Sequence, residues 1–277
     1  MMISHNVAHS VENVRSEIER AKTSFGVTDL FKFRDPKINE YLHGGFGSST
    51  DFELITVAGK TNIGKSLFTQ NMLLAAIRAK KRFAYICLED SMKNTIARLE
   101  KMIDPGIFQQ ADKLIFTEED VREMYTIEDA LDFIEYLYEV ENVELVVLDH
   151  LQFLQESIDR NGLKVDENNL SRILMRKMNR MMKLNQKTLI LVSHVNKRSE
   201  KDSELLDMII GSSAIVQAST KVLYLSKDEN NDLNLQLIKS RYTKRQDEPL
   251  VFEYDDNTLE VRAKVYYKTE GVTNELC

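Results

Sequence analysis

The sequence contains little of what secreted or membrane-spanning proteins need. It has only two cysteines, Cys87 inside an apolar run and Cys277 at the end, which cannot build a disulfide framework and fit reducing conditions. No apolar run approaches the roughly 18 residues that a membrane span requires, and the start of the chain lacks the apolar core of a signal peptide. We therefore expect a cytoplasmic protein without a membrane partner.

Positive charge is also in deficit. The 277 residues include 37 Lys and Arg against 44 Asp and Glu, which gives a net charge of -7. This balance argues against a surface coated in positive charge for indiscriminate nucleic-acid binding. The deficit is uneven, however, because residues 153–201 contain 11 Lys and Arg but five Asp and Glu. The sequence thus leaves room for a local basic track.

Only three prolines interrupt the chain, and from residue 53 onward short apolar runs alternate with helical patterns. Strands are expected at 53–57, 82–88, 145–148, 188–192, 221–225 and 233–239, and helices at 65–80, 126–140 and 169–185. Val-, Ile- and Leu-rich runs separated by helices predict a mostly parallel sheet covered on both faces. Residues 248–254 and 259–267 predict a C-terminal β-hairpin that extends this sheet.

The N-terminal segment reads differently from the rest. Residues 11–23 predict a helix with Ser10 as its N-cap, and its apolar stripe of Val11, Val14 and Ile18 is narrow. Such a helix is a poor core element but a reasonable docking arm. We therefore divide the chain into a helical arm and linker, 1–42, that docks on a neighbouring subunit, and a folded domain, 43–277.

Residues 59–66 read GKTNIGKS and match the pattern G-x-x-x-x-G-K-[ST], between an expected strand and an expected helix. A chance match in a chain of this length has odds on the order of one in a hundred. This strand–loop–helix arrangement turns backbone N–H groups toward bound phosphates. We expect Lys65 to bind the β- and γ-phosphates of ATP, or of another NTP or dNTP, and the Ser66 hydroxyl to bind Mg²⁺. The expected phosphate loop comprises Gly59, Lys60, Thr61, Asn62, Ile63, Gly64, Lys65 and Ser66.

Two carboxylates follow apolar runs and suit the same site. Asp149 ends the run LVVL, where a carboxylate can hold Mg²⁺ beside a phosphate loop. Glu89 follows RFAYICL, where it can orient or deprotonate the attacking water. The alternative for this stretch is helix capping by Asp90 or Ser91, since a helix begins near Met92. Both interpretations can hold, with Glu89 catalytic and Ser91 capping.

Taken together with His194 at the end of the run LILVSH, these motifs resemble the RecA-like motor domain of hexameric replicative DNA helicases. The resemblance is to the helicase half of phage primase-helicases and to the mitochondrial Twinkle helicase, with bacterial DnaB more distant. It covers about residues 43–261 and rests on GKTNIGKS, ICLEDS, VVLDHLQ, LVSHVNKRSE, GSSAIVQAS and IKSRYT. It implies an α/β RecA-like P-loop NTPase fold and an ATP-dependent helicase that forms a ring and translocates on single-stranded DNA.

The resemblance also implies roles for individual residues. His194, whose position alone is typical of a capped or solvated side chain, becomes a sensor of the γ-phosphate that signals to DNA-binding loops. Lys239 and Arg241 reach into the ATP site of the adjacent subunit, where Arg241 acts as a catalytic finger. Tyr254 stacks on the nucleotide base, although a structural role in the hairpin is the alternative. Lys197, Arg198 and Lys201 are expected to contact DNA in a central channel.

The expected partners are single-stranded and forked DNA and further copies of the chain, in a hexameric ring. Nothing before residue 40 resembles a primase or the N-terminal domain of DnaB, so the protein is either a minimal motor or works with a separate primase or loader. Two other functions stay open. One is a RecA-like recombinase or recombination mediator, and the other is a regulatory ATPase of the loader or clock type.

Overall fold

A computed structural model describes residues 31–47, 51–121, 127–150, 186–195, 216–241 and 243–264, together with positions 177, 180, 181 and 184. The predicted arm helix at 11–23 and most of the predicted helix at 169–185 lie outside the described residues. The same holds for Lys197, Arg198 and Lys201.

The described chain forms a nine-stranded sheet with the order β3-β2-β4-β5-β1-β6-β7-β8-β9. Strands β1 to β6 run parallel to their neighbours, and β7 to β9 add an antiparallel extension at one side. The strands are β1 Glu53–Gly59, β2 Phe83–Cys87, β3 Lys113–Thr117, β4 Leu145–Asp149, β5 Thr188–His194, β6 Lys221–Lys227, β7 Leu233–Ser240, β8 Leu250–Tyr254 and β9 Val261–Ala263.

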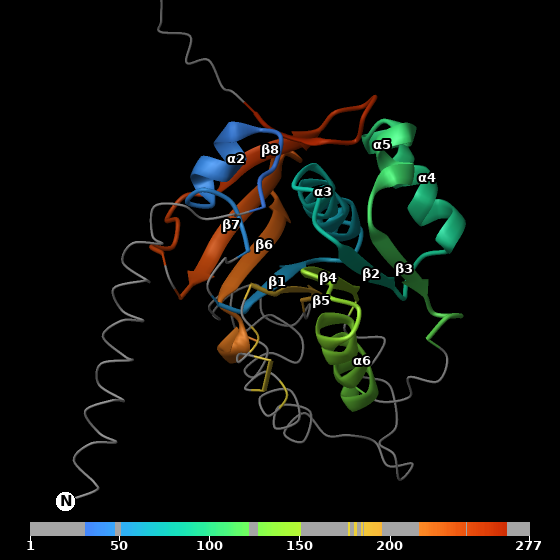
Figure 1. Cartoon of the computed structure of the whole chain (residues 1–277). Helices are drawn as coiled ribbons and strands as arrows, with labels where there is room; N and C mark the ends of the chain where they lie inside the picture. Colours follow the sequence, from blue (N-terminus) through green and yellow to red (C-terminus); the bar gives the residue numbers. More distant parts are fainter. Residues whose placement is uncertain are drawn as a thin grey trace, which may run out of the picture.

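Helices cover both faces of the parallel part (Figure 1). Helix α3, Lys65–Arg78, lies on one face near α4, Met92–Met102, and α5, Pro105–Gln110, whereas α6, Ile127–Glu139, lies on the other. Side chains of a strand alternate between the two faces, so Val147 packs in the cluster with α3 while Val146 and Leu148 pack in the cluster with α6. Burial on both faces explains why these strands read as continuous apolar runs.

The six strands expected from apolar runs are confirmed, each within two residues at either end. The C-terminal hairpin is also confirmed, as β8 and β9. Strand β3 was missed because it is an edge strand whose residues are mostly half-buried, so its sequence KLIFT carries a weak signal. Among the described residues, no helix combines the length and the apolar character that crossing a membrane would demand.

The core begins earlier in the chain than residue 43, where the sequence places the start of the domain. Phe31, Phe33 and Ile38 are buried in the cluster that contains α3. The Phe31 and Phe46 rings lie 5.4 Å apart and their backbones form a β-bridge. Helix α2, Pro36–Tyr41, begins after Asp35, whose carboxylate accepts a hydrogen bond from the Lys37 N–H. Residues 31–42 thus pack as part of the folded domain.

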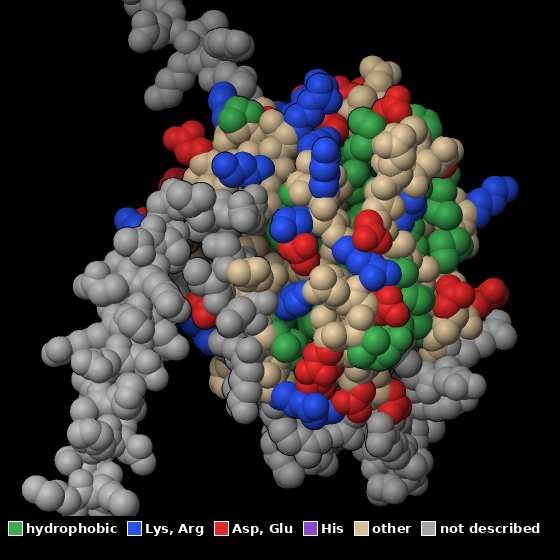
Figure 2. All heavy atoms as spheres, in the orientation of Figure 1, with side chains coloured by type: hydrophobic (Ala, Val, Ile, Leu, Met, Phe, Trp, Pro, Cys, Tyr) green, Lys and Arg blue, Asp and Glu red, His purple; other side chains and the backbone are tan. Residues whose placement is uncertain are grey.

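The surface of the described residues carries both charges. On the face drawn in Figure 2, Lys and Arg side chains are interspersed with Asp and Glu. Several of them form ion pairs, such as Arg82 with Glu141 at 3.0 Å and Arg98 with Asp90 at 2.7 Å. A basic track for a polyanion is therefore not a property of this face.

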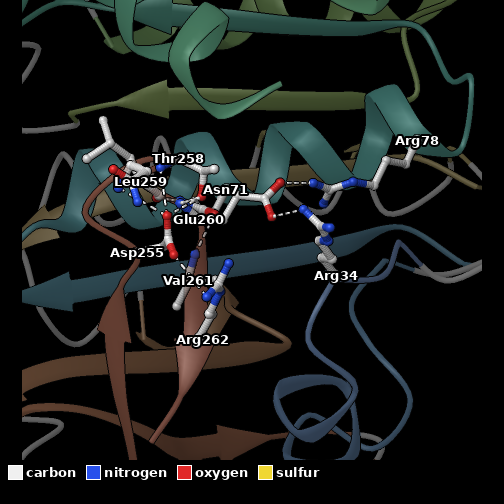
Figure 3. A network of polar contacts seen from close by, with 10 residues as sticks. Arg34, Asn71, Arg78, Asp255, Thr258, Leu259, Glu260, Val261 and Arg262 are labelled. Atoms are coloured by element: carbon white, nitrogen blue, oxygen red, sulfur yellow. Dashed lines mark hydrogen bonds and ion pairs between the residues drawn. The ribbon is translucent and has the colours of Figure 1, made fainter. Parts of the chain in front are cut away.

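A polar network fastens the C-terminal hairpin to α3 (Figure 3). The Asn71 amide donates to the Leu259 carbonyl at 3.1 Å and accepts from the Val261 N–H at 2.9 Å. The Glu260 carboxylate, 4% exposed, pairs with Arg78 of α3 and with Arg34, 3.1 Å away, from the N-terminal segment. Three segments distant in sequence meet at this one carboxylate.

Replacing Glu260 by alanine is expected to lower the free energy of unfolding by about 1.5–3 kcal/mol, the range for hydrogen bonds to charged groups. The loss arises because a buried acceptor of two guanidinium groups disappears. Urea unfolding followed by circular dichroism measures it. Glu253→Ala on β8 is the control, since Glu253 is exposed and lies 3.8 Å from Lys264, and it should cost less than about 1 kcal/mol. Equal losses in the two variants would contradict a special role for the Glu260 network.

Candidate active site

The parallel strands deliver the predicted site residues to one edge of the sheet. Gly59 at the end of β1 is in register with His194 at the end of β5, and Cys87 at the end of β2 is in register with Asp149 at the end of β4. At this edge lies a cleft of about 650 Å³. Its lining includes Asn62, Gly64, Lys65, Ser66, Leu67, Cys87, Glu89, Asp90, Arg98, Asp149, His194 and Leu259. Ligands of open α/β sheets bind outside such carboxyl ends.

Two glycines of the loop between β1 and α3 are required by its geometry. A Cβ on Gly59 would lie 2.7 Å from the Leu225 carbonyl oxygen of β6. Gly64 has a φ of 94°, which side chains with a Cβ rarely adopt, and a Cβ there would also press on the Tyr254 ring at 3.3 Å. Because α3 begins at Lys65, the N–H groups of its first turn lack helical acceptors and can bind phosphate oxygens.

Lys65 holds its ammonium group in this loop. The side chain is buried, and Nζ donates to the Lys60 carbonyl at 2.9 Å and lies 3.1 Å from Nδ1 of His194. Burial lowers the pKa of Lys65, while the negative charges of Asp149 and Glu89 raise it. The arrangement provides a positive charge exactly where the loop would cradle the phosphates of a nucleotide.

Asp149 is the most buried carboxylate of the site, at 1% exposed. The Tyr85 hydroxyl donates to its Oδ2 at 2.9 Å, whereas Oδ1 has no hydrogen-bond partner among the described residues. Burial raises the pKa of Asp149, and hydrogen bonds from Ser66 and Tyr85 lower it. A carboxylate oxygen held in place beside the Ser66 hydroxyl fits Mg²⁺, which prefers such oxygen ligands. Tyr85 was missed by the sequence reasoning, although a tyrosine inside a buried strand does need a polar partner.

The stretch after β2 satisfies both interpretations that its sequence allowed for the helix cap. Ser91 is the N-cap of α4, and its hydroxyl accepts from the Asn94 N–H at 3.3 Å. Asp90 also binds Asn94 and pairs with Arg98. Glu89 takes no part in the cap and lines the cleft with its side chain half exposed. The catalytic role of Glu89 stays a prediction that this position accommodates.

His194 is neutral at pH 7. Burial, followed by the charges of Lys65 and His150, lowers its pKa to about 4. Nδ1 faces Lys65 as an acceptor, so the proton of the neutral ring belongs on Nε2, which leaves one N–H donor for a ligand oxygen. A neutral imidazole of this kind suits the predicted sensing of a γ-phosphate.

The sequence reasoning passed over His150, which follows β4 directly. Its ring is buried and meets the His194 ring edge-on, with centroids 4.5 Å apart. Its Nδ1 lies 3.5 Å from Oε2 of Glu89. The quoted motif VVLDHLQ contained the histidine, but only the sheet register shows that it lies between the ends of β2 and β5.

Tyr254 lies beside the phosphate loop. Its hydroxyl donates to the Gly64 carbonyl at 3.0 Å, and its ring packs edge-on against Phe252 with centroids 5.5 Å apart. These contacts tie the C-terminal hairpin to the start of α3. Stacking on a nucleotide base stays a prediction, and the structural contacts of the alternative are present.

Lys239 and Arg241 lie at the opposite edge of the sheet from the cleft. Strand β7 runs antiparallel to β6, so Leu235 pairs with Leu225 at the level of Gly59, while Ser240 pairs with Lys221 at the far end. Arg241, six residues beyond Leu235, is thus about 20 Å from the phosphate loop along the strand direction. Both side chains bind carbonyls of residues 216–217, and Arg241 is exposed.

The sheet order and this loop together define a P-loop ATPase with a RecA-like fold. The fold matches a KaiC-like protein from the hyperthermophilic archaeon Pyrococcus horikoshii OT3, with a TM-score of 0.64 and 14% identity over 86% of this chain and 100% of that one. It also matches the ATPase domain of a helicase, with a TM-score of 0.70 and 14% identity over 91% of this chain and 97% of that one. At this identity the matches establish the fold.

A family model described as "AAA domain" matches residues 16–200, more than half of the sequence, so the chain belongs to the AAA domain family. A search of curated protein sequences found no match. The predicted fold class is therefore confirmed, as is nucleotide binding and hydrolysis as the general activity.

Proposed function

We propose that the protein is an ATP-dependent DNA helicase whose subunits form a ring, probably the simplest assembly being excluded only by its own geometry: each ATP site is completed by the next copy. The observation that carries the proposal is the position of Arg241 and Lys239, about 20 Å along the strand direction from the phosphate loop of their own chain. If these residues act on a nucleotide, that nucleotide is bound by a neighbouring copy.

The residues of one chain divide the chemistry among them. Backbone N–H groups of residues 59–66 and the Lys65 ammonium hold the phosphates, and Ser66 and Asp149 hold Mg²⁺, which neutralises charge on the phosphate oxygens. Glu89 orients the attacking water and accepts its proton. His194 donates its N–H to the γ-phosphate and loses that partner when phosphate departs. The chain continues from β5 into residues 196–211, the predicted DNA-binding loop, so this change reaches DNA.

Two other functions use the same fold. The match to a KaiC-like protein favours a regulatory ATPase, in which hydrolysis switches the binding of a partner. A recombinase or recombination mediator would form an open filament on DNA rather than a ring. All three bind and hydrolyse ATP, so ATPase activity by itself does not discriminate among them.

The test measures ATP hydrolysis with and without single-stranded DNA, and strand separation on a forked duplex. We expect single-stranded DNA to stimulate hydrolysis and the fork to be unwound, with both activities lost in a Lys65→Ala control. Electron microscopy with a non-hydrolysable ATP analogue should show closed or spiral rings around the strand. Hydrolysis indifferent to DNA would support the regulatory ATPase, and filaments without unwinding would support the recombinase.

A further inference from the structure

Three side chains from three neighbouring strands converge at the mouth of the cleft. Glu89 follows β2, His150 follows β4 and His194 ends β5, and one polar atom of each lies within 4.8 Å of those of the other two. Strand β4 lies between β2 and β5 in the sheet, so His150 is the middle member of the group.

His150 contacts each of the other two in a different way. Toward Glu89 it presents a polar atom, with Nδ1 3.5 Å from Oε2. Toward His194 it presents a ring face or edge, with the two ring planes at 89°. The backbone reinforces the first contact, because the Leu88 N–H donates to the Asp149 carbonyl at 2.7 Å and so ties together the residues that precede Glu89 and His150.

Two histidines and one carboxylate are also a common ligand set for transition metals. Here the Lys65 ammonium lies 3.1 Å from Nδ1 of His194, and its charge opposes a second cation at this position. The group is therefore better suited to arranging the reacting side chains than to holding a metal ion of its own.

We propose that His150 is a positioning residue that couples His194 to Glu89. The inference rests on the proposed roles of those two residues as sensor and catalytic base. A separation of 3.5 Å is the outer limit of a hydrogen bond, so a small movement of the His150 ring makes or breaks its bond to the carboxylate. Because the ring touches His194, a shift of His194 on binding the γ-phosphate moves His150 and orients Glu89 toward the attacking water.

Two substitutions separate the two contacts. His150→Phe keeps a ring against His194 but removes the nitrogen that faces Glu89. His150→Asn keeps an amide near the position of Nδ1 but removes the ring. Basal ATP hydrolysis without DNA is measured together with the binding of a fluorescent ATP analogue, and circular dichroism verifies that each variant is folded.

We expect His150→Phe to lower kcat about 10- to 100-fold, a part of the 10²–10⁴-fold contribution typical of general-base catalysis. KM and analogue binding should change less than about threefold, because His150 acts on the base and not on the phosphates. His150→Asn should restore at least part of kcat. A uniform fall in kcat and analogue binding in both variants is what a merely structural role would produce, and it would overturn the proposal.

The decisive readout is the double variant. In a Glu89→Gln background, His150→Phe should cause no further loss in single-turnover hydrolysis, because His150 acts through the carboxylate. An equal loss in both backgrounds would overturn the coupling. If Glu89→Gln alone leaves hydrolysis intact, the proposed role of Glu89 fails. If Glu89→Gln abolishes hydrolysis while His150→Phe does not change kcat, only the present inference fails.

Discussion

Glu89→Gln is expected to hydrolyse ATP about 10²–10⁴-fold more slowly than the unmodified protein while binding it with nearly unchanged affinity. Glutamine has almost the same shape as glutamate but cannot accept a proton from water. Binding should persist because Lys65 and the backbone of the phosphate loop, rather than Glu89, face the expected phosphates. The expected signature is therefore a loss in kcat without a rise in KM.

Release of inorganic phosphate measures the hydrolysis rate, and titration with a fluorescent ATP analogue measures affinity. Glu100→Gln is the matched control, since Glu100 is an exposed carboxylate on α4 outside the cleft. It should leave both quantities unchanged. Hydrolysis by Glu89→Gln at the control rate would mean that another group activates the water.

The sequence predicted most of the fold because the strands that build it are buried on both faces. Runs such as LVVL and TLILV have one structural interpretation once a P-loop fixes the class of sheet. Their carboxyl ends share one edge, so Glu89, Asp149 and His194 could be placed together before any contact was known. The structure confirms that they line one cleft.

The partners of these residues could not be predicted, because they depend on the order of strands in the sheet. Tyr85 reaches Asp149 only because β2 and β4 are neighbours, and His150 lies between Glu89 and His194 only because β4 separates β2 from β5. Glu260 shows the same limitation, since its two arginines are 182 and 226 residues away in the sequence. Apolar periodicity carries no information on such pairings.

For Arg241, the structure adds a constraint that the sequence lacked. As a motif, KSRYTKR is an ordinary basic strand end, and only the family resemblance gave it a catalytic role. The antiparallel register of β6 and β7 now places it at the edge of the sheet opposite the cleft of its own chain. An arginine so placed either has no part in hydrolysis or acts on the nucleotide of another copy.

Arg241→Ala is expected to reduce ATP hydrolysis about 10³–10⁵-fold, the range for removing an arginine finger, while ATP binding persists. The guanidinium matches the charge that spreads over the γ-phosphate oxygens in the transition state, and alanine leaves that charge unmatched. Arg245→Ala is the control, because Arg245 is also exposed and its one described ion pair, to Asp247 at 3.8 Å, is weak. It should retain full activity.

Mixing two inactive variants distinguishes action within one chain from action between chains. Arg241→Ala subunits keep an intact cleft with Glu89, and Glu89→Gln subunits keep Arg241. In a mixed assembly, every interface that joins the cleft of the first to the arginine of the second has a complete catalytic set, so hydrolysis should reappear and reach its maximum near equal proportions. Without exchange of residues between subunits, both proteins stay inactive in every mixture. That result, from an assembly shown by light scattering to contain both variants, would remove the basis for a ring in which each copy completes its neighbour's site.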